Sequence, residues 1–171
     1  DGVWIGTRFV TSEEADVDPS YKERIINASE TGTLLSSKVF NGGWAAGGRA
    51  LRNSTIENWE AAGSPEVGER PGEGEVIAKA ADGGPVERYS SIASYSGVAG
   101  DLEGLSNWAG QGVGLIKRVQ PAADIVREIT EEAIQVLRKA STLWRVADAP
   151  DSLTTSCDRM TPETSHLIGA L

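Results

Sequence analysis

The sequence has few of the residues that most often carry redox, metal or nucleophilic chemistry. Cys157 is its one cysteine and His166 is its one histidine. A single cysteine excludes an intrachain disulfide, a cysteine-based zinc site and a CxxC redox motif, and it makes a reducing, cytoplasmic compartment the default expectation. His166 stands in a polar C-terminal stretch, where we expect a solvated side chain rather than a catalytic one.

Long apolar runs and an excess of positive charge are also missing. The apolar runs, such as Leu34-Leu35 and Val113 to Ile116, are far shorter than the roughly 20 residues that cross a bilayer, so we expect no membrane-spanning segment. The 16 Lys and Arg residues are outnumbered by 25 Asp and Glu residues, which gives a formal net charge of −9. Because proteins that bind nucleic acid need clustered basic side chains, nucleic acid is not an expected partner.

The most informative stretch that is present lies close to the start of the chain. Residues 2–11 read Gly-Val-Trp-Ile-Gly-Thr-Arg-Phe-Val-Thr, a β-favouring run that is interrupted by a Gly-Thr pair. The acidic residues of the following Thr-Ser-Glu-Glu sequence are typical of the first turn of a helix. We therefore predict a buried strand, a tight turn at Gly6-Thr7 and a short helix, with Glu13 and Glu14 acting on the helix dipole rather than as a catalytic pair.

The next part of the chain alternates between helical patterns and glycine-rich connections. Asp18-Pro19 combines an N-cap residue with a proline at the first helical position, and it predicts a helix to about Ser29. Further predictions are a short strand within 33–40, a glycine-rich loop over 41–48 and a helix over 50–62. The loop lacks both GxGxxG and GK[ST], so an ordinary flexible connection is favoured over a phosphate cradle.

The C-terminal half combines a polar excursion with two helical patterns. Residues 63–100 are rich in glycine, proline, glutamate and serine, and they indicate a loop-rich insertion with a short helix over 75–81. Residues 101–116 show helical spacing, but glycines within a helix need a packing reason, such as a close approach of another backbone. The helix that follows Pro121 carries a core-facing apolar stripe. Residues 142–171 predict a flexible tail.

The Gly6-Thr7 turn is a candidate anion site. Glycine lets a ligand approach the backbone N–H groups, the threonine hydroxyl adds a donor, and a helix N-terminus supplies a partial positive charge. A strand that ends in Gly-Thr before a helix is also common as plain turn chemistry. The spacing alone leaves both interpretations open.

Several segments of the chain resemble one enzyme family. The run from Gly2 to Ala15, followed by Asp-Pro-Ser-Tyr-Lys-Glu at 18–23, is similar to the closing barrel segment of nitronate monooxygenases, formerly called 2-nitropropane dioxygenases. The related FMN-dependent enoyl-ACP reductases share this pattern. Residues 39–42, 49–53 and 108–114 and the helix from Ala122 also resemble the C-terminal region of that family, so that the resemblance covers roughly residues 2–140.

The resemblance implies a fold. The family has a (β/α)8 barrel, in which ligands bind at the C-terminal ends of the strands and phosphate often binds near the last two. The chain is then expected to be α/β, the C-terminal fragment of a TIM-type barrel, mostly helices and loops with one or two short N-terminal strands. Its expected parts are the last barrel strands with their helices (1–62), a loop-rich insertion (63–100), a C-terminal helical pair (101–141) and a flexible tail (142–171).

The resemblance also implies a cofactor and its contacts. Ile5, Gly6 and Thr7 match the family's stretch that contacts the FMN phosphate, in agreement with the independent anion-site interpretation. Trp4 occupies a position that is commonly glutamine in the family, so only a backbone contact with FMN is implied there. Trp44, Trp59 and Trp108 are expected to be packing anchors, and Gln111 a polar residue on a helix that contacts a loop.

The implied activity is the FMN-dependent oxidation of alkyl nitronates by dioxygen. In the family a histidine from an earlier strand assists substrate activation, and no histidine of this sequence matches that motif. We therefore expect the chain to supply the FMN-phosphate end of the site and to be inactive alone. Two alternatives remain open, namely an enoyl-ACP reductase-like enzyme and a non-catalytic helical module that binds a partner through the helix over 121–140.

Overall fold

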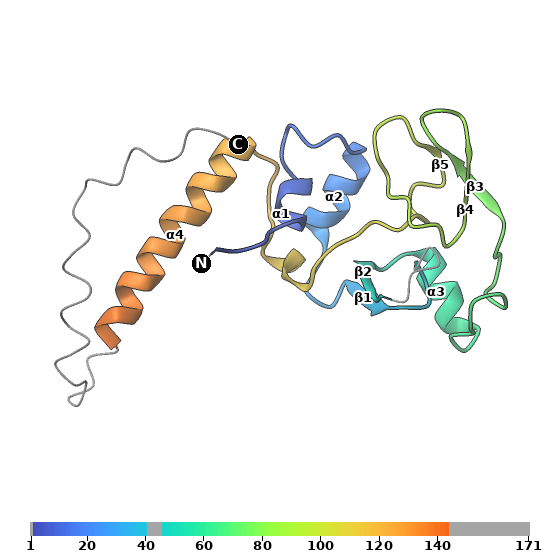
Figure 1. Cartoon of the computed structure of the whole chain (residues 1–171), viewed down its shortest axis with the longest axis horizontal. Coiled ribbons are helices and arrows are strands. Elements are labelled where there is room, and N and C mark those ends of the chain that lie inside the picture. The colour runs from blue at the N-terminus through green and yellow to red at the C-terminus, as the bar shows by residue number, and fades with distance from the viewer. Residues whose placement is uncertain (1, 41–45, 144–171) are drawn as a thin grey trace. The chain divides into compact units, whose positions relative to one another are not determined.

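The computed structural model describes residues 2–40 and 46–143, and it divides the chain into two compact units, residues 1–127 and 128–171. The expected α/β class is confirmed, with short strands and helices (Figure 1). The helices are α1 (Thr7–Val10), α2 (Pro19–Asn27), α3 (Ser54–Ala61), the 3₁₀ helix η1 (Gln111–Leu115) and α4 (Ala122–Leu143). The strands are β1 (Thr33–Ser36), β2 (Gly48–Leu51), β3 (Val76–Lys79), β4 (Pro85–Glu87) and β5 (Ala99–Gly100).

The strands form two separate antiparallel sheets in the first unit (Figure 1). In one sheet β1 pairs with β2, from Thr33 opposite Leu51 to Ser36 opposite Gly48. In the other sheet β3 lies between β4 and β5. Because no strand within residues 2–40 and 46–143 is longer than four residues, the ladders alone order only a small part of the backbone.

The predicted buried strand at residues 2–11 is wrong. Thr7–Val10 form α1, and Val3 and Trp4 are 81% and 100% exposed. An extended segment becomes a strand only when a neighbouring backbone pairs with its N–H and C=O groups, and no strand that the structure describes pairs with residues 2–6. The Gly6 carbonyl instead accepts hydrogen bonds from the amides of Phe9 and Val10, which starts the helix ahead of the Thr-Ser-Glu-Glu sequence.

The helix predicted from Asp18-Pro19 is confirmed. The Asp18 carboxylate accepts a hydrogen bond from the Ser20 amide at 2.9 Å, and Pro19 is the first helical residue. The helix α2 ends at Asn27, slightly before the expected end. Its Tyr21 and Ile25 are 2% and 0% exposed, so the predicted apolar face is the buried face.

One predicted helix in the middle of the chain is a strand, and another is confirmed but begins later than expected. Residues 75–81 form no helix, because the β-branched Val76 and Ile77 lie in β3, and a turn at Asp82–Gly84 brings β4 back alongside it. The Gly83 backbone has a φ of +85°, a conformation that glycine adopts without strain. The helix predicted over 50–62 begins only at Ser54, after β2. Strand pairing between distant segments outweighs the local helical pattern in both places.

The helix predicted over 101–116, one half of the expected helical pair, is also wrong. Only Gln111–Leu115 are helical, as η1, although Leu105 and Ala109 are buried as their spacing suggested. The close backbone approach expected at the glycines exists at Gly114, where an added Cβ would lie 2.9 Å from the Glu30 amide nitrogen. An added Cβ at Gly112 would meet nothing within 4 Å.

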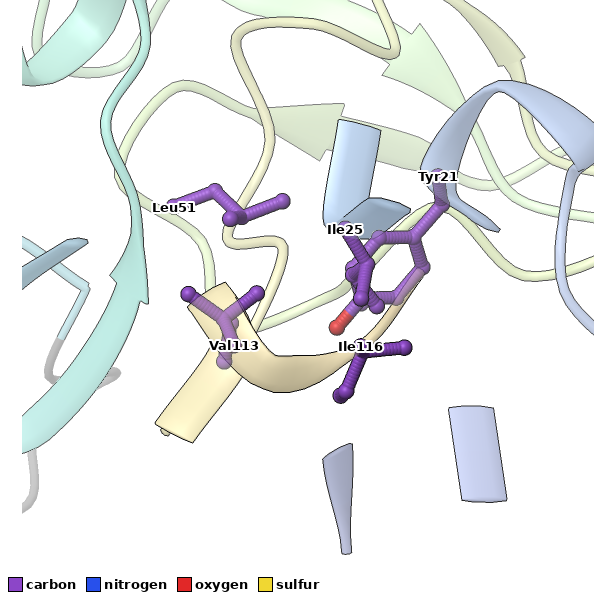
Figure 2. Close-up of a cluster of buried hydrophobic side chains, with 7 residues drawn as sticks. Tyr21, Ile25, Leu51, Val113 and Ile116 are labelled. Carbon is purple, nitrogen blue, oxygen red and sulfur yellow. The ribbon is translucent and has the colours of Figure 1, made fainter. Parts of the chain in front are cut away.

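The main core of the first unit joins α2 to η1. Figure 2 shows Val113 and Ile116 from the η1 region beside Tyr21 and Ile25 of α2, with Leu51 of β2 in the same cluster. The 3₁₀ helix therefore buries apolar side chains that were expected to project from a longer α-helix. Val113 and Ile116 are buried, but the segment around them, which contains Gly112 and Gly114, forms a 3₁₀ helix and not an α-helix.

The helix that follows Pro121 is confirmed as α4, but its stripe is core-facing only near its start. Ile125 is fully buried, whereas Val136 and Leu137 are 64% and 69% exposed. The predicted tail over 142–171 lies outside the described residues, apart from the backbone of residues 142 and 143, which completes α4. Trp44, Cys157 and His166 also lie outside them.

The buried side chain of Asn53 connects two backbone segments. Its Oδ1 accepts a hydrogen bond from the Ile56 amide and caps α3, while its Nδ2 donates to the carbonyls of Glu103 and Leu105 at 3.0 and 2.8 Å. One amide group thus holds the first turn of α3 against the irregular segment that crosses it. This side chain is 2% exposed, so water cannot replace the lost bonds.

We therefore expect Asn53→Ala to lower the free energy of unfolding by about 2–4 kcal/mol, through the lost cap and two unpaired carbonyls. Urea unfolding followed by circular dichroism measures the change. Asn58→Ala is the matched control, because Asn58 lies on the exposed face of the same helix, and it should change the free energy by less than about 0.5 kcal/mol. Equal effects of the two substitutions would contradict this role of Asn53.

Candidate functional site

A cavity of about 280 Å³ lies beside the Gly6-Thr7 turn, within the first unit. Its walls come from α1, α2 and β2 and from the irregular segments around Ala93 and Ala109. Most of its lining is apolar or aromatic. The lining residues are Gly6, Thr7, Val10, Val17, Tyr21, Arg49, Ala93, Tyr95, Trp108, Ala109 and Gly110.

Gly6 and Thr7 present backbone and hydroxyl groups to this cavity. The Thr7 Oγ1 accepts a hydrogen bond from the Gly110 amide at 2.9 Å, which orients the hydroxyl and leaves its own proton available as a donor. A Cβ added at Gly6 would meet no atom within 4 Å, so a ligand can approach the backbone there. The φ of Gly6 is −105°, which other residues can adopt, so backbone conformation alone does not require glycine.

The other two residues predicted to contact the cofactor lie outside the lining. Trp4 is fully exposed, and Ile5 is half-buried without reaching the cavity. The structure therefore brings together two of the four residues of the predicted site. The contacts of all four with FMN stay a prediction.

Trp108 is both a packing anchor, as expected, and part of the cavity wall. Its indole contacts two hydrophobic clusters and meets the Phe40 ring edge-on, with the ring centroids 6.2 Å apart. A Cβ added at Gly48 would overlap the indole, so a glycine is needed there for the ring to pack. Trp59 is 7% exposed and is likewise a packing anchor. Gln111 is exposed and lies outside the cavity lining.

Tyr21 closes one side of the cavity and is tied to the segment that forms another side. Its hydroxyl donates a hydrogen bond to the Trp108 carbonyl. Burial raises the pKa of Tyr21 well above its ordinary value, with a smaller contribution from the nearby Tyr95. The phenol is therefore a neutral hydrogen-bond donor at physiological pH, and its bond to the Trp108 carbonyl holds this part of the cavity wall in place.

Arg49 is the one charged residue in the cavity lining, and the sequence analysis missed it. Its Nη1 donates a hydrogen bond to the Thr33 Oγ1 at 3.1 Å, across the β1–β2 pair. It was missed because residues 41–48 were assigned to a loop and residues 50–62 to a helix. Only the pairing of β2 with β1 and with the segment around Trp108 brings this side chain to the Gly6-Thr7 turn.

One of the two acids that follow α1 contacts the start of another helix. The Glu14 carboxylate accepts hydrogen bonds from the Ala122 amide, the closer at 2.9 Å, at the first residue of α4. The predicted interaction of an acid with a helix N-terminus thus occurs, but at a different helix. Within the described residues no three His, Cys, Asp or Glu side chains gather as metal ligands, and no helix has the length and apolarity to span a membrane.

Comparisons with known proteins place these features in a family context. A family model described as nitronate monooxygenase matches residues 1–132. The nitronate monooxygenase of Neurospora crassa is 30% identical over 148 residues, which cover 81% of this chain and 33% of that protein. The nitronate monooxygenase npaC of Metarhizium robertsii is 28% identical, with 80% of this chain and 36% of that protein covered.

One solved structure is similar over the same part of the chain. FabK from Thermotoga maritima is 24% identical, with a TM-score of 0.47, and the match covers 81% of this chain and 38% of that one. This chain spans about a third of the length of the curated relatives it matches.

The raised pKa of Tyr21 predicts a loss of stability at alkaline pH. Above pH of about 10 the phenol ionises in the unfolded chain but not in the folded one, so the free energy of unfolding should fall by up to about 1.4 kcal/mol per pH unit. In Tyr21→Phe this contribution is absent. Urea unfolding at pH 9, 10 and 11 should therefore give a steeper decline for the unsubstituted chain, and equal slopes would contradict the prediction.

Proposed function

Because this chain belongs to the nitronate monooxygenase family, we propose that it supplies the phosphate end of an FMN site in an enzyme that oxidises alkyl nitronates with dioxygen. The observation that carries the proposal is the cavity beside Gly6 and Thr7. An approachable backbone, a hydroxyl donor and one guanidinium, that of Arg49, all line it. These are the groups that a phosphate monoester needs.

The chemistry and size of the cavity fit one end of the cofactor. Phosphate oxygens accept hydrogen bonds from backbone N–H groups, hydroxyls and cationic side chains. The volume of about 280 Å³ lies just below the range of roughly 300–1,000 Å³ that is typical of complete small-molecule sites. It suits a phosphate with part of its ribityl chain, while the isoalloxazine ring requires further walls.

The proposal applies to a polypeptide of the relatives' length in which this segment occurs. There the segment would be the C-terminal part of a (β/α)8 barrel, and residues 2–5 would gain neighbours for strand pairing. FMN, when bound, supplies the electron acceptor for the nitronate and the donor to dioxygen. The chain's own residues bind and orient the phosphate end, and we propose that these 171 residues alone do not turn over substrate.

The role of the Gly6-Thr7 turn can be tested with a substitution that the fold should tolerate. Gly6→Val would add a side chain where no atom lies within 4 Å, at a backbone conformation open to other residues. Because that side chain would occupy the approach to the backbone, the dissociation constant of FMN should rise by at least about tenfold. Flavin fluorescence in the full polypeptide measures it.

Gly112→Val provides the matched control for this substitution. An added Cβ at Gly112 also meets nothing within 4 Å, and Gly112 lies outside the cavity lining. Its dissociation constant for FMN should equal that of the unsubstituted protein. A Gly6→Val variant that binds FMN equally well would contradict the assignment of this turn to the phosphate.

The activity itself is tested on the purified full polypeptide. It should be yellow with bound FMN and should consume oxygen when an alkyl nitronate is added. A folded, colourless protein that takes up no FMN would rule out the flavoprotein proposal. Flavin-dependent reduction of an enoyl thioester without nitronate oxidation would instead support the enoyl reductase alternative.

A further inference from the structure

Arg49 stands apart from the paired arginines of this acidic chain. Arg24, Arg52, Arg70, Arg88 and Arg127 each form an ion pair with a carboxylate. Within residues 2–40 and 46–143, no carboxylate forms an ion pair with Arg49, although the chain has nine more acidic than basic residues. Its one hydrogen bond joins a single guanidinium N–H to the Thr33 hydroxyl.

Within the part of the chain that the structure describes, the surroundings of Arg49, which is half-buried, offer it no anionic partner. The cavity that it lines has walls of valine, alanine, tyrosine and tryptophan, and no carboxylate belongs to the lining. A guanidinium has five N–H donors, and an ion with apolar neighbours loses part of its hydration without compensation. An anion that enters the cavity would supply the missing partner.

The fold does not need the guanidinium for strand pairing. Arg49 lies opposite Leu35 in the β1–β2 pair, and its carbonyl accepts a hydrogen bond from the Ala109 amide at 2.9 Å. These contacts use the backbone alone, and any residue could make them. The side chain is therefore available for a ligand at the position that the backbone pairing gives it.

We propose that Arg49 is the counter-charge of the FMN phosphate, an inference that rests on the proposed function. The guanidinium fork matches two phosphate oxygens, and the Thr7 hydroxyl of the same cavity donates to the phosphate as well. Arg49 is then a cofactor-binding residue contributed by β2, separate in sequence from the Gly6-Thr7 turn. Its guanidinium binds the phosphate of FMN and not the isoalloxazine ring.

The test compares FMN with riboflavin, which has the same ring and ribityl chain but no phosphate. Arg49→Gln should raise the dissociation constant of FMN by about tenfold to a hundredfold, as expected for a lost charge-assisted hydrogen bond, and should leave that of riboflavin unchanged. Arg49→Lys should restore part of the preference for FMN. Both constants come from flavin fluorescence titrations of the full polypeptide, with circular dichroism as the check on folding.

Thr33→Val separates ligand binding from a structural role. It removes the side-chain partner of Arg49 but keeps the charge, so the ratio of FMN to riboflavin affinity should stay as in the unsubstituted protein. A Thr33→Val variant that loses this ratio as fully as Arg49→Gln would show that Arg49 acts only through its contact with Thr33, and would overturn the inference.

Three further outcomes are decisive. If Arg49→Gln keeps the affinity ratio but raises the KM for a nitronate, Arg49 binds the substrate anion and the inference is wrong, while the proposed function stands. If the unsubstituted polypeptide binds neither FMN nor riboflavin, the proposed function itself fails. Inorganic phosphate should also shift the Arg49 side-chain NMR resonance. If the same phosphate concentration shifts this resonance equally in Thr7→Val and Gly6→Val, Arg49 binds anions unspecifically and the inference is wrong.

Discussion

The first unit depends on the hydrogen bonds of one short segment, residues 107–110. With strands of at most four residues, the sheets cannot order the unit by themselves. Residues 107–110 supply what is missing, because they bond to three other parts of the chain, namely α1, α2 and β2. The Asn107 carbonyl accepts from Leu51, the Trp108 carbonyl from Tyr21, the Ala109 amide donates to Arg49 and the Gly110 amide to Thr7.

The same segment connects the fold to the candidate site. Trp108, Ala109 and Gly110 form part of the cavity wall while their backbone groups bind α1, α2 and β2. The hydrogen bond from Gly110 fixes the orientation of the Thr7 hydroxyl before any ligand arrives. A donor that is already oriented loses little entropy on binding. The positions of the groups that line the cavity are therefore set by the same contacts that stabilise the first unit.

Local chemistry explains what could be predicted from the sequence. Asp18-Pro19 and Pro121 specify helix starts through capping and a fixed φ, and both were correct because such interactions span only a few residues. The strand β3 and the cavity residue Arg49 depend on pairing between distant segments, which a single sequence does not reveal. The Gly6-Thr7 turn was found because its chemistry lies within two residues, whereas the cation that faces the same cavity is contributed by β2.

The net charge of −9 and the proposed phosphate site are compatible. At physiological salt the charges of exposed carboxylates are screened within about 8 Å, so the distant acidic surface has little effect inside a cavity. The half-buried guanidinium of Arg49 interacts more strongly with a neighbouring anion than fully exposed charges do. The net negative charge disfavours nucleic acid as a ligand of the protein surface. It does not exclude the binding of a single phosphate group at Arg49.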